Sequence, residues 1–207
     1  MPAIFTTGDR EALRQRMIEA GWECLLERGY RATRVEDVAR VAGIAQGTFY
    51  GFFGSKREFV AEMVINNRRE LQAELGDLRA RTGGSIGRGD LGAWMRSVWH
   101  SERVVFRCIG ARDYQRICEL LPDEVCLGPE LEGSLLDEIG RAVRDAGGTS
   151  DPQLASALQR TCALTLLARD QFEPEVLERT VDALIEATLD ALYGRGDEGE
   201  RGGEGDE

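Results

Sequence analysis

The sequence predicts an all-helical fold. Apolar residues recur every three or four positions through most of its 207 residues, the spacing that gathers them on one face of a helix. Thr33 with Glu36, and Ser55 with Glu58, have the spacing of capping boxes, and Pro152 stands where a first helical residue is expected. With 42% hydrophobic and 30% charged residues, the composition is that of an ordinary soluble globular protein of one to two domains.

The first helix is expected over residues 9–28. Its apolar stripe is broad enough to complete a small three-helix core with the segment that follows. The stripe consists of Leu13, Met17, Ala20 and Cys24, flanked by Ile18, Gly21 and Leu25. Gly29 is expected to end this helix, with Tyr30 folding back on its last turn.

Residues 33–60 predict two short helices joined by a tight turn, followed by the capped start of a third. Thr33 caps the first of these helices, and Gly43 ends it in a left-handed turn. The segment 46–52 is too short to hold a helix alone in water, so it must pack on its neighbours. This is a helix-turn-helix arrangement, in which the second helix enters the major groove of DNA.

The same stretch resembles the DNA-binding motif of TetR-family transcriptional regulators. The matching residues are Thr33, Val38, Ala39, Ala42, Gly43, Ile44, Gly47, Tyr50, Phe53 and Lys56. The resemblance covers residues 10–65, about a third of the chain. It implies an all-helical protein with three small N-terminal helices for DNA and a larger C-terminal part for a small ligand and for dimerisation.

Two positions depart from the pattern of that family. Ala45 stands where a serine or threonine usually caps the recognition helix, a loss of about 1 kcal/mol unless another group caps it. Gly51 and Phe52 replace the polar or aromatic pair that often follows the tyrosine.

The residues expected to contact base edges are Gln46, Gly47 and Thr48. A glutamine favours adenine because its amide can form two hydrogen bonds with that base. The alternative is that Gln46 and Thr48 are solvent-exposed polar residues of a short helix.

Three further residues are candidates for phosphate contacts. The resemblance implies this role for Tyr50, for which a core position is the alternative. Lys56 is the one lysine beside 25 arginines, and it begins a helix whose free amides could hold a phosphate together with its ammonium. Arg34 is either a phosphate contact or a plainly solvated side chain.

The net charge of −11 is unevenly distributed along the chain. Residues 1–60 hold nine basic and eight acidic residues, whereas the rest hold 17 and 29. The acidity therefore lies outside the expected DNA-binding part, where it repels phosphate least.

The remaining chain predicts a helical C-terminal part. The helix that begins at Lys56 is expected to run to about residues 75–80 and to belong to both parts, and residues 82–89 to form a flexible connection. Three helices are expected over 90–147, with Asp90 capping the first, Gly110 near its end, Pro122 ending the second and Pro129 beginning the third.

Aromatic and basic residues of this part are candidates for an effector pocket, although packing and surface roles are the alternative: Trp94, Trp99, Arg103, Phe106, Arg107 and Tyr114. Two long antiparallel helices follow at residues 152–169 and 174–193. The resemblance implies that these helices form a four-helix dimer interface with their copies, through Leu158, Val181, Leu184 and Thr188.

Other classes of function find little support in the sequence. The five cysteines are widely spaced and there is one histidine, which argues against a disulfide framework, a zinc site or another metal site. No nucleophile–base pair or nucleotide-binding loop suggests an enzyme, and no cofactor is expected. There is no signal peptide or apolar run long enough for a membrane span, so a cytoplasmic protein is expected.

We therefore expect a DNA-binding domain at residues 1–55 with its motif at about 34–52, a ligand-binding and dimerisation domain at 56–193, and a disordered acidic tail at 194–207. The expected function is that of a homodimeric repressor, released from a palindromic double-stranded DNA operator by a small-molecule effector. The alternative is a thiol- or metal-responsive regulator that uses the scattered cysteines.

Overall fold

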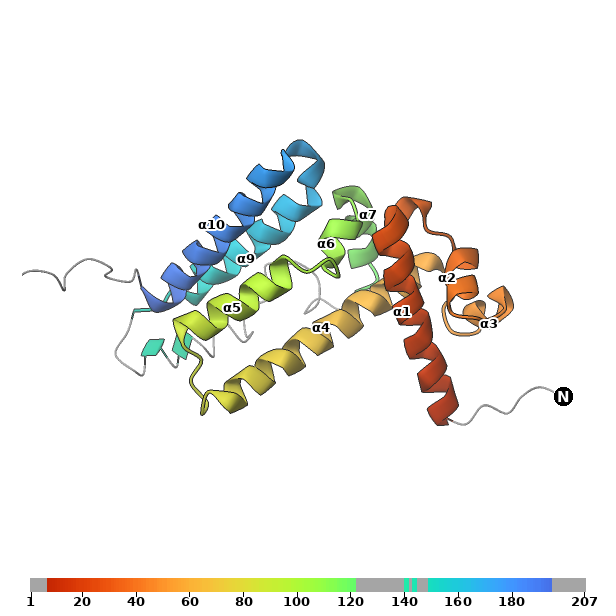
Figure 1. Cartoon of the computed structure of the whole chain (residues 1–207), viewed down its shortest axis with the longest axis horizontal. Coiled ribbons are helices and arrows are strands. Elements are labelled where there is room, and N and C mark those ends of the chain that lie inside the picture. The colour runs from red at the N-terminus through yellow and green to blue at the C-terminus, as the bar shows by residue number, and fades with distance from the viewer. Residues whose placement is uncertain (1–6, 122–139, 142, 145–148, 195–207) are drawn as a thin grey trace, which may run out of the picture.

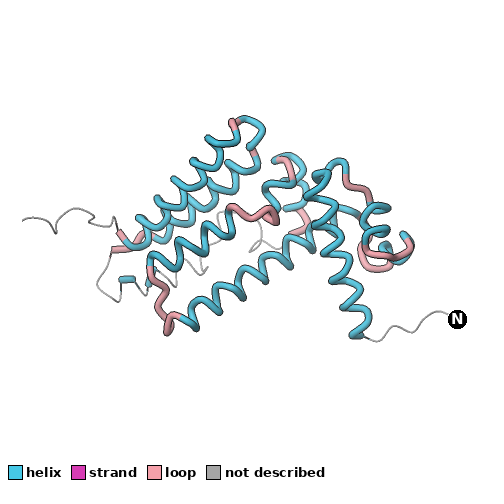
Figure 2. Tube along the Cα trace, viewed as in Figure 1, coloured by secondary structure: helices cyan, strands magenta, loops and turns pink. Residues whose placement is uncertain are grey.

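The structure, a computed structural model, describes residues 7–121, 140–141, 143–144 and 149–194. Within these residues all regular structure is helical, as the sequence predicts (Figures 1 and 2). The helices are α1 (Thr7–Ala32), α2 (Val35–Val41), α3 (Gln46–Tyr50), α4 (Lys56–Arg81), α5 (Arg88–Trp99), α6 (Val105–Cys108), α7 (Ala111–Cys118), α9 (Pro152–Leu167), the 3₁₀ helix η1 (Arg169–Gln171) and α10 (Pro174–Tyr193).

Two features predicted from the sequence involve residues that the structure does not describe. Most of the helix begun by Pro129 and all but the first residue of the acidic tail lie outside the described part of the chain, and residues 140–141 and 143–144 of the predicted helix are helical. None of the described helices is long and apolar enough to cross a membrane.

Helices α1 to α3 form a head at one end of the molecule (Figure 1). Its core is built around three phenylalanine rings, with Phe59 lying 5.1 Å from Phe49 and 4.9 Å from Phe53 between ring centroids. Gly21 lets α1 approach these rings, because a Cβ at this position would lie 2.5 Å from the ring of Phe59. The first helix therefore completes the core of the head, as predicted.

The turns that shape the head follow the expected glycines. Gly29 has φ 72° and ψ 168° and interrupts α1, and Gly43 has φ 66° in the turn between α2 and α3. Only glycine adopts such a positive φ without steric cost. Both predicted helix ends are confirmed, although the chain forms a further short helical segment to Ala32 after Gly29.

The predicted capping box at Thr33 is wrong in its residues. The Thr33 hydroxyl is buried and donates to the carbonyl oxygens of Cys24 and Gly29, at 3.0 and 2.9 Å. Arg34 is instead the N-cap of α2, and its amide donates to the carboxylate of Asp37 at 3.3 Å. Thr33 thus closes the end of α1, and the box is displaced by one residue.

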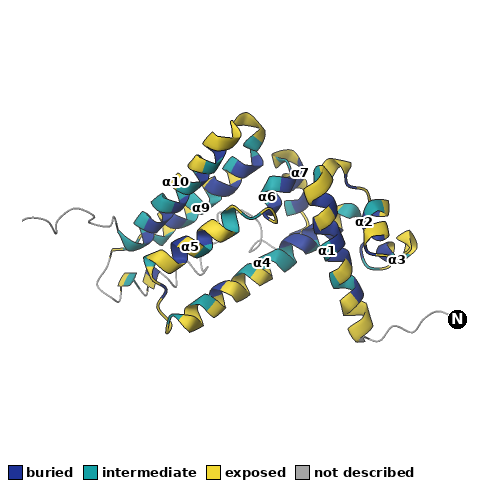
Figure 3. Ribbon diagram, in the orientation of Figure 1, coloured by how far each residue is buried: buried dark blue, intermediate teal, exposed yellow. Residues whose placement is uncertain are grey.

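The body of the molecule is built on the long pair α9 and α10, with α5 packed along α10 (Figure 1). The buried faces of these helices meet in a second hydrophobic core, and the opposite faces are exposed (Figure 3). Helix α4 contributes to both cores, since Phe59 is buried in the head and Leu75 in the body. The expectation of one helix shared by the two parts is confirmed.

The single helix expected from Asp90 to Gly110 is wrong. Helix α5 ends at Trp99, Asp90 lies within its first turn, and Gly110 is the N-cap of α7. The carbonyl oxygen of Trp99 accepts two hydrogen bonds from Arg107, at 3.2 and 3.0 Å, in a bend that periodicity did not predict. Tertiary packing outweighs local helix propensity at this bend.

Candidate nucleic-acid interface

Helix α3 is held by its inner face. Phe49 is completely buried, and its ring centroid lies 5.3 Å from that of Phe53. The turn before α3 is fixed by a hydrogen bond from the Ile44 amide to the carbonyl of Ala39, and by Arg16, whose guanidinium donates to the carbonyl of Ala42. A five-residue helix is therefore positioned by packing rather than by its own stability.

The outer face of α3 carries the residues predicted to contact bases. Gln46 and Gly47 are exposed, and Thr48 is partly buried. A Cβ built at Gly47 would meet no atom within 4 Å, so another surface can come very close to the backbone at this point. As the sequence indicated, Ala45 precedes the helix without any side-chain capping bond.

Gln46 is held by a residue that the sequence analysis did not single out. Its Nε2 donates a 2.7 Å hydrogen bond to a carboxylate oxygen of Glu36 on α2. A carboxylate only accepts hydrogen bonds, so the amide nitrogen of Gln46 must face Glu36. Ten residues separate the two across the turn, and no short motif in the sequence signals the contact.

The predicted phosphate contacts lie in different environments. Tyr50 is 50% exposed, which places its ring outside the core. Arg34 is exposed at the start of α2. Arg10, which was not predicted from the sequence, lies beside the two residues that follow Tyr50, because its guanidinium donates to the carbonyl of Gly51 at 3.4 Å and stacks over Phe52 at 4.6 Å.

Lys56 is engaged within the head. Its Nζ donates to the carbonyl oxygens of Tyr30 and Thr33, at 2.8 and 2.9 Å, and lies 4.3 Å from the centre of the Tyr30 ring. Burial lowers the pKa of Lys56, and the nearby Asp113 carboxylate opposes this change. The phosphate contact of Lys56 stays a prediction, and the structure adds a second role in joining α1, α2 and α4.

The start of α4 is capped in nearly the way the sequence predicts. The Ser55 hydroxyl accepts a hydrogen bond from the Glu58 amide at 3.1 Å. The Glu58 carboxylate reaches back one residue further than expected, to the amide of Gly54 at 2.8 Å.

The six residues predicted to line an effector pocket do not all come together. Trp99 stacks on Phe106 at 6.0 Å, and Phe106 meets Tyr114 edge-on at 5.2 Å, which makes one aromatic row. Trp94 donates to Glu74 on α4, and Arg103 pairs with Glu19 in the head. The guanidinium of Arg107 forms two hydrogen bonds with Glu178, at 2.7 and 2.8 Å, which largely neutralises its charge.

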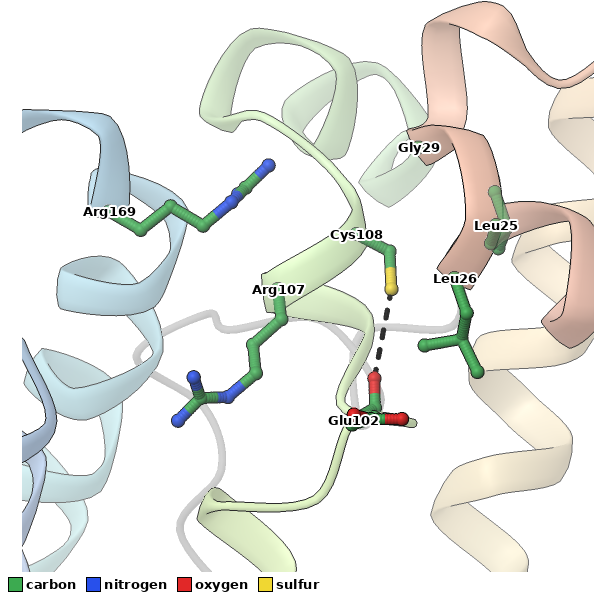
Figure 4. A pocket seen from close by; sticks show the side chains of 7 residues that line it. All are labelled: Leu25, Leu26, Gly29, Glu102, Arg107, Cys108 and Arg169. Atoms are coloured by element: carbon green, nitrogen blue, oxygen red, sulfur yellow. Dashed lines mark hydrogen bonds between the residues drawn. The ribbon is translucent and has the colours of Figure 1, made fainter. Parts of the chain in front are cut away.

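A cleft of about 350 Å³ lies where the head meets the body. Figure 4 shows Leu26 of α1 on one side and Arg169 on the other, with Cys108 between them. Arg169 donates to the carbonyl oxygens of Phe106 and Ile109, at 3.2 and 2.9 Å, so it fastens η1, which follows α9, to the end of α6. Of the residues that line this cleft, only Arg107 was predicted as a pocket residue from the sequence.

Two of the residues predicted for the dimer interface are covered within a single chain. Val181 and Thr188 are completely buried, and the Thr188 hydroxyl accepts a hydrogen bond from Gln159 at 2.9 Å. Leu158 and Leu184 are partly exposed. The burial of Val181 and Thr188 does not support their contact with a partner chain.

Three of the four described cysteines, Cys24, Cys108 and Cys162, are buried and show no sign of a reactive thiol. Burial raises the pKa of Cys24 and Cys108, and raises that of Cys162 to about 12. Such groups stay protonated at neutral pH, and the thiolate is the reactive form. Among the residues that the structure describes, no group of three or more possible ligands could hold a metal ion. Cys126 lies outside the described residues.

Comparison with known proteins identifies the N-terminal part. Residues 17–63 match the sequence profile of bacterial regulatory proteins of the tetR family. The chain is 35% identical over 63 residues to the transcriptional repressor DhaR of Mycobacterium sp. strain GP1, and 40% identical over 57 residues to the repressor KstR2 of Mycobacterium tuberculosis. The match to DhaR covers 30% of this chain and 32% of DhaR. The match to KstR2 covers 28% of this chain and 28% of KstR2.

Solved structures share the fold over most of the chain. A TetR-family protein from Mesorhizobium loti has a TM-score of 0.59 at 21% identity, covering 92% of this chain and all of that one. FadR from Bacillus subtilis, solved in complex with stearoyl-CoA, has a TM-score of 0.52 at 17% identity, covering 86% of this chain and 99% of that one. Residues 17–63 are thus similar to bacterial regulatory proteins of the tetR family, and the chain shares its fold with a solved TetR-family protein over most of its length.

Proposed function

We propose that this regulator is a homodimeric repressor that a small-molecule effector releases from a palindromic operator. The observation that carries the proposal is the outer face of α3. There, exposed Gln46 and Gly47 stand on a helix that the buried ring of Phe49 fixes to the head. DhaR and KstR2, the relatives that share this segment, are repressors.

In this proposal Gln46, Gly47 and Thr48 contact base edges. Gly47 lets the backbone of α3 come close to the floor of the major groove, since nothing lies within 4 Å of its missing side chain. Arg34, Tyr50 and Lys56 contact phosphates and set the register of the helix. The DNA-binding domain would comprise residues 1–55.

A second copy would cover exposed stripes on α9 and α10. Leu154 and Leu164 on α9 are 49% and 53% exposed, and Val176 on α10 is 48% exposed. Apolar or small side chains continue both stripes, at Ala157 and Thr161 on α9 and at Thr180 and Ala183 on α10. Their spacing of three and four residues suits a four-helix interface between two chains. We place the interface there, with Leu158 and Leu184 at its margin.

The shared helix α4 would connect the effector to DNA. An effector can lower operator affinity only if it binds the two arrangements of the heads with different free energies. A coupling of about 1 to 3 kcal/mol would weaken operator binding roughly 5- to 150-fold. That FadR of the same fold was solved with stearoyl-CoA is a precedent for ligand binding by such a protein.

Selection of bound sequences from random DNA tests the proposal directly. The purified chain should enrich one palindromic site, and sedimentation should show one dimer for each site. Gln46→Ala protein should enrich a less defined site. A chain that stays monomeric at micromolar concentration, or that enriches no site, would rule out the proposed function.

A further inference from the structure

Arg10 of α1 lies against the two residues that follow helix α3. Its guanidinium donates to the carbonyl of Gly51 at 3.4 Å, and its Cζ atom lies 4.6 Å from the centre of the Phe52 ring. Gly51 is the C-cap of α3, and 41 residues separate it from Arg10. Folding thus brings an arginine of the first helix to the end of the helix that begins at Gln46.

The end of α3 has no basic side chain of its own. Its last turn contains no basic residue, and the two residues that follow, Gly51 and Phe52, have no side-chain hydrogen-bond donor. The Phe52 ring is partly buried against the core of the head. A guanidinium within about 6 Å of the centre of such a ring is attracted to its face. Arg10 therefore supplies a positive charge at this end of α3, and Phe52 helps to hold it there.

The charge of Arg10 is not neutralised by a neighbouring carboxylate. Within the part of the chain that the structure describes, Arg10 forms no ion pair, and it is exposed. Arg14, one helical turn further along α1, lies in the same way over Phe53, at 5.2 Å, but it pairs with Glu62 at 2.9 Å. Of these two arginines on one side of α1, Arg10 is the one whose charge stays available to another molecule.

An arginine in this position can also serve only to hold the turn after α3. Its bond to Gly51 is long and exposed to water, so it contributes little to stability by itself. The bond uses one N–H group, and a guanidinium has five. The contacts with Gly51 and Phe52 therefore place the guanidinium and leave donors for a further acceptor.

We propose that Arg10 contacts a DNA phosphate beside the major groove that α3 enters. The inference rests on the proposed function, since it requires that the outer face of α3 bind duplex DNA. A recognition helix places its N-terminal residues at the base edges, and because the groove is about 12 Å wide, the phosphates that border it come close to the other end of the helix. Arginine binds a phosphate with two parallel hydrogen bonds, and a guanidinium already held on Phe52 loses little freedom on binding.

The experiment compares wild type with Arg10→Gln, Arg10→Lys and the matched control Arg69→Gln. Arg69 is an exposed arginine of α4 that lies about 20 Å beyond Lys56 along the helix, at 1.5 Å per residue. Salt therefore screens its charge from DNA bound at the head. The probes are the palindromic duplex that selection from random DNA enriches and a shuffled duplex of the same length. The affinity for each duplex is measured at a series of salt concentrations, and the melting temperature of each protein is recorded.

Arg10→Gln should weaken binding to both duplexes and leave the base preference unchanged, because a phosphate contact carries no sequence information. The slope of log affinity against log salt should fall by about 0.9 for each bound chain. From about 50 to about 200 mM salt, the ratio of wild-type to Arg10→Gln affinity should therefore fall about 3.5-fold for each chain. Arg10→Lys should recover most of the slope, because an ammonium also neutralises a phosphate. Arg69→Gln should bind both duplexes as wild type does.

An unchanged salt slope in Arg10→Gln would overturn the assignment, and a lower melting temperature with that result would show that Arg10 only holds the turn after α3. Equal losses of slope in Arg10→Gln and Arg69→Gln would also overturn it, because net charge alone would then explain the effect. If wild type binds the enriched duplex and Arg10→Gln keeps its slope, the assignment of Arg10 fails and the proposed function stands. If wild type binds neither duplex, both fail.

Discussion

The amide of Gln46 is oriented by Glu36 through a 2.7 Å hydrogen bond that crosses the turn between α2 and α3. One hydrogen of Nε2 is used in this bond. The second hydrogen and the oxygen Oε1 remain available, and together they match the N7 and N6 edge of adenine. The pair therefore presents one defined donor and acceptor pattern on the exposed surface of α3.

Glu36→Ala should relax the base preference at the position that Gln46 contacts. Without the carboxylate the amide can turn over, and loss of a bidentate contact corresponds to about 1 to 3 kcal/mol of discrimination. Affinity for unrelated DNA should rise at the same time, because a negative charge near the phosphates is removed. Binding to operators that differ only at this base pair measures both effects. The control Glu23→Ala removes an exposed charge from α1 and should leave the base preference unchanged. If wild type, Glu36→Ala and Glu23→Ala all have the same base preference, Glu36 does not position Gln46.

Replacement of Gln46 and Lys56 should separate base contacts from phosphate contacts. Gln46→Ala or Thr48→Ala should cost about 1 to 3 kcal/mol on the operator and relax base preference. Lys56→Ala should weaken binding to all sequences alike and reduce the salt slope by about one. Titrations at several salt concentrations provide the measurement.

Lys56 requires a further control because it also binds the carbonyls of Tyr30 and Thr33. Its loss should lower the melting temperature as well. If Lys56→Ala weakens binding with an unchanged salt slope, the lysine supports the head and contacts no phosphate.

A charge on the exposed stripe of α9 should give folded monomers. Leu164 is 53% exposed in the single chain, so Leu164→Glu places its carboxylate in water until a partner covers it. Val181 is completely buried, and Val181→Glu should instead unfold the chain. Sedimentation and circular dichroism distinguish the two results. Leu164→Glu protein that remains dimeric would place the interface elsewhere.

Features with local causes could be predicted from the sequence. The left-handed turns at Gly29 and Gly43, the cap at Ser55 and the starts of α9 and α10 each depend on residues within one helical turn. The roles of Thr33 and Lys56 could not be predicted in the same way. The acceptors of Lys56 lie 23 and 26 residues earlier in the chain.

The residues predicted for the dimer interface show that the sequence also does not indicate which surface covers an apolar face. The spacing of apolar residues places Val181 on an apolar face of α10, but it does not indicate whether α5 and α9 or a second chain cover that face. In the structure α5 and α9 cover it. Likewise, the spacing of the arginines does not indicate that Arg107 pairs with Glu178, which lies 71 residues away.

The coupling between Arg107 and Glu178 should weaken as the pH falls. The hydrogen bonds from Arg107 are the main reason that the pKa of Glu178 is held below its ordinary value of 4.5, and His100 adds a further bond at 2.8 Å. A carboxyl group whose folded pKa is depressed contributes stability above its unfolded pKa and loses this contribution as the pH falls through the folded pKa. The pair joins α6 to α10, so the free energy of unfolding should show the change.

A double-mutant cycle isolates this contribution from other acid-sensitive groups. Arg107→Met, Glu178→Met and the double variant are unfolded with urea at a series of pH values, from neutral to well below 4.5. The coupling energy should be present at neutral pH and should vanish at the acid end, where Glu178 is protonated in both states. Glu178 is 41% exposed, so solvent screening keeps the effect modest. A coupling that is constant with pH would mean that Arg107 and Glu178 interact through packing rather than charge.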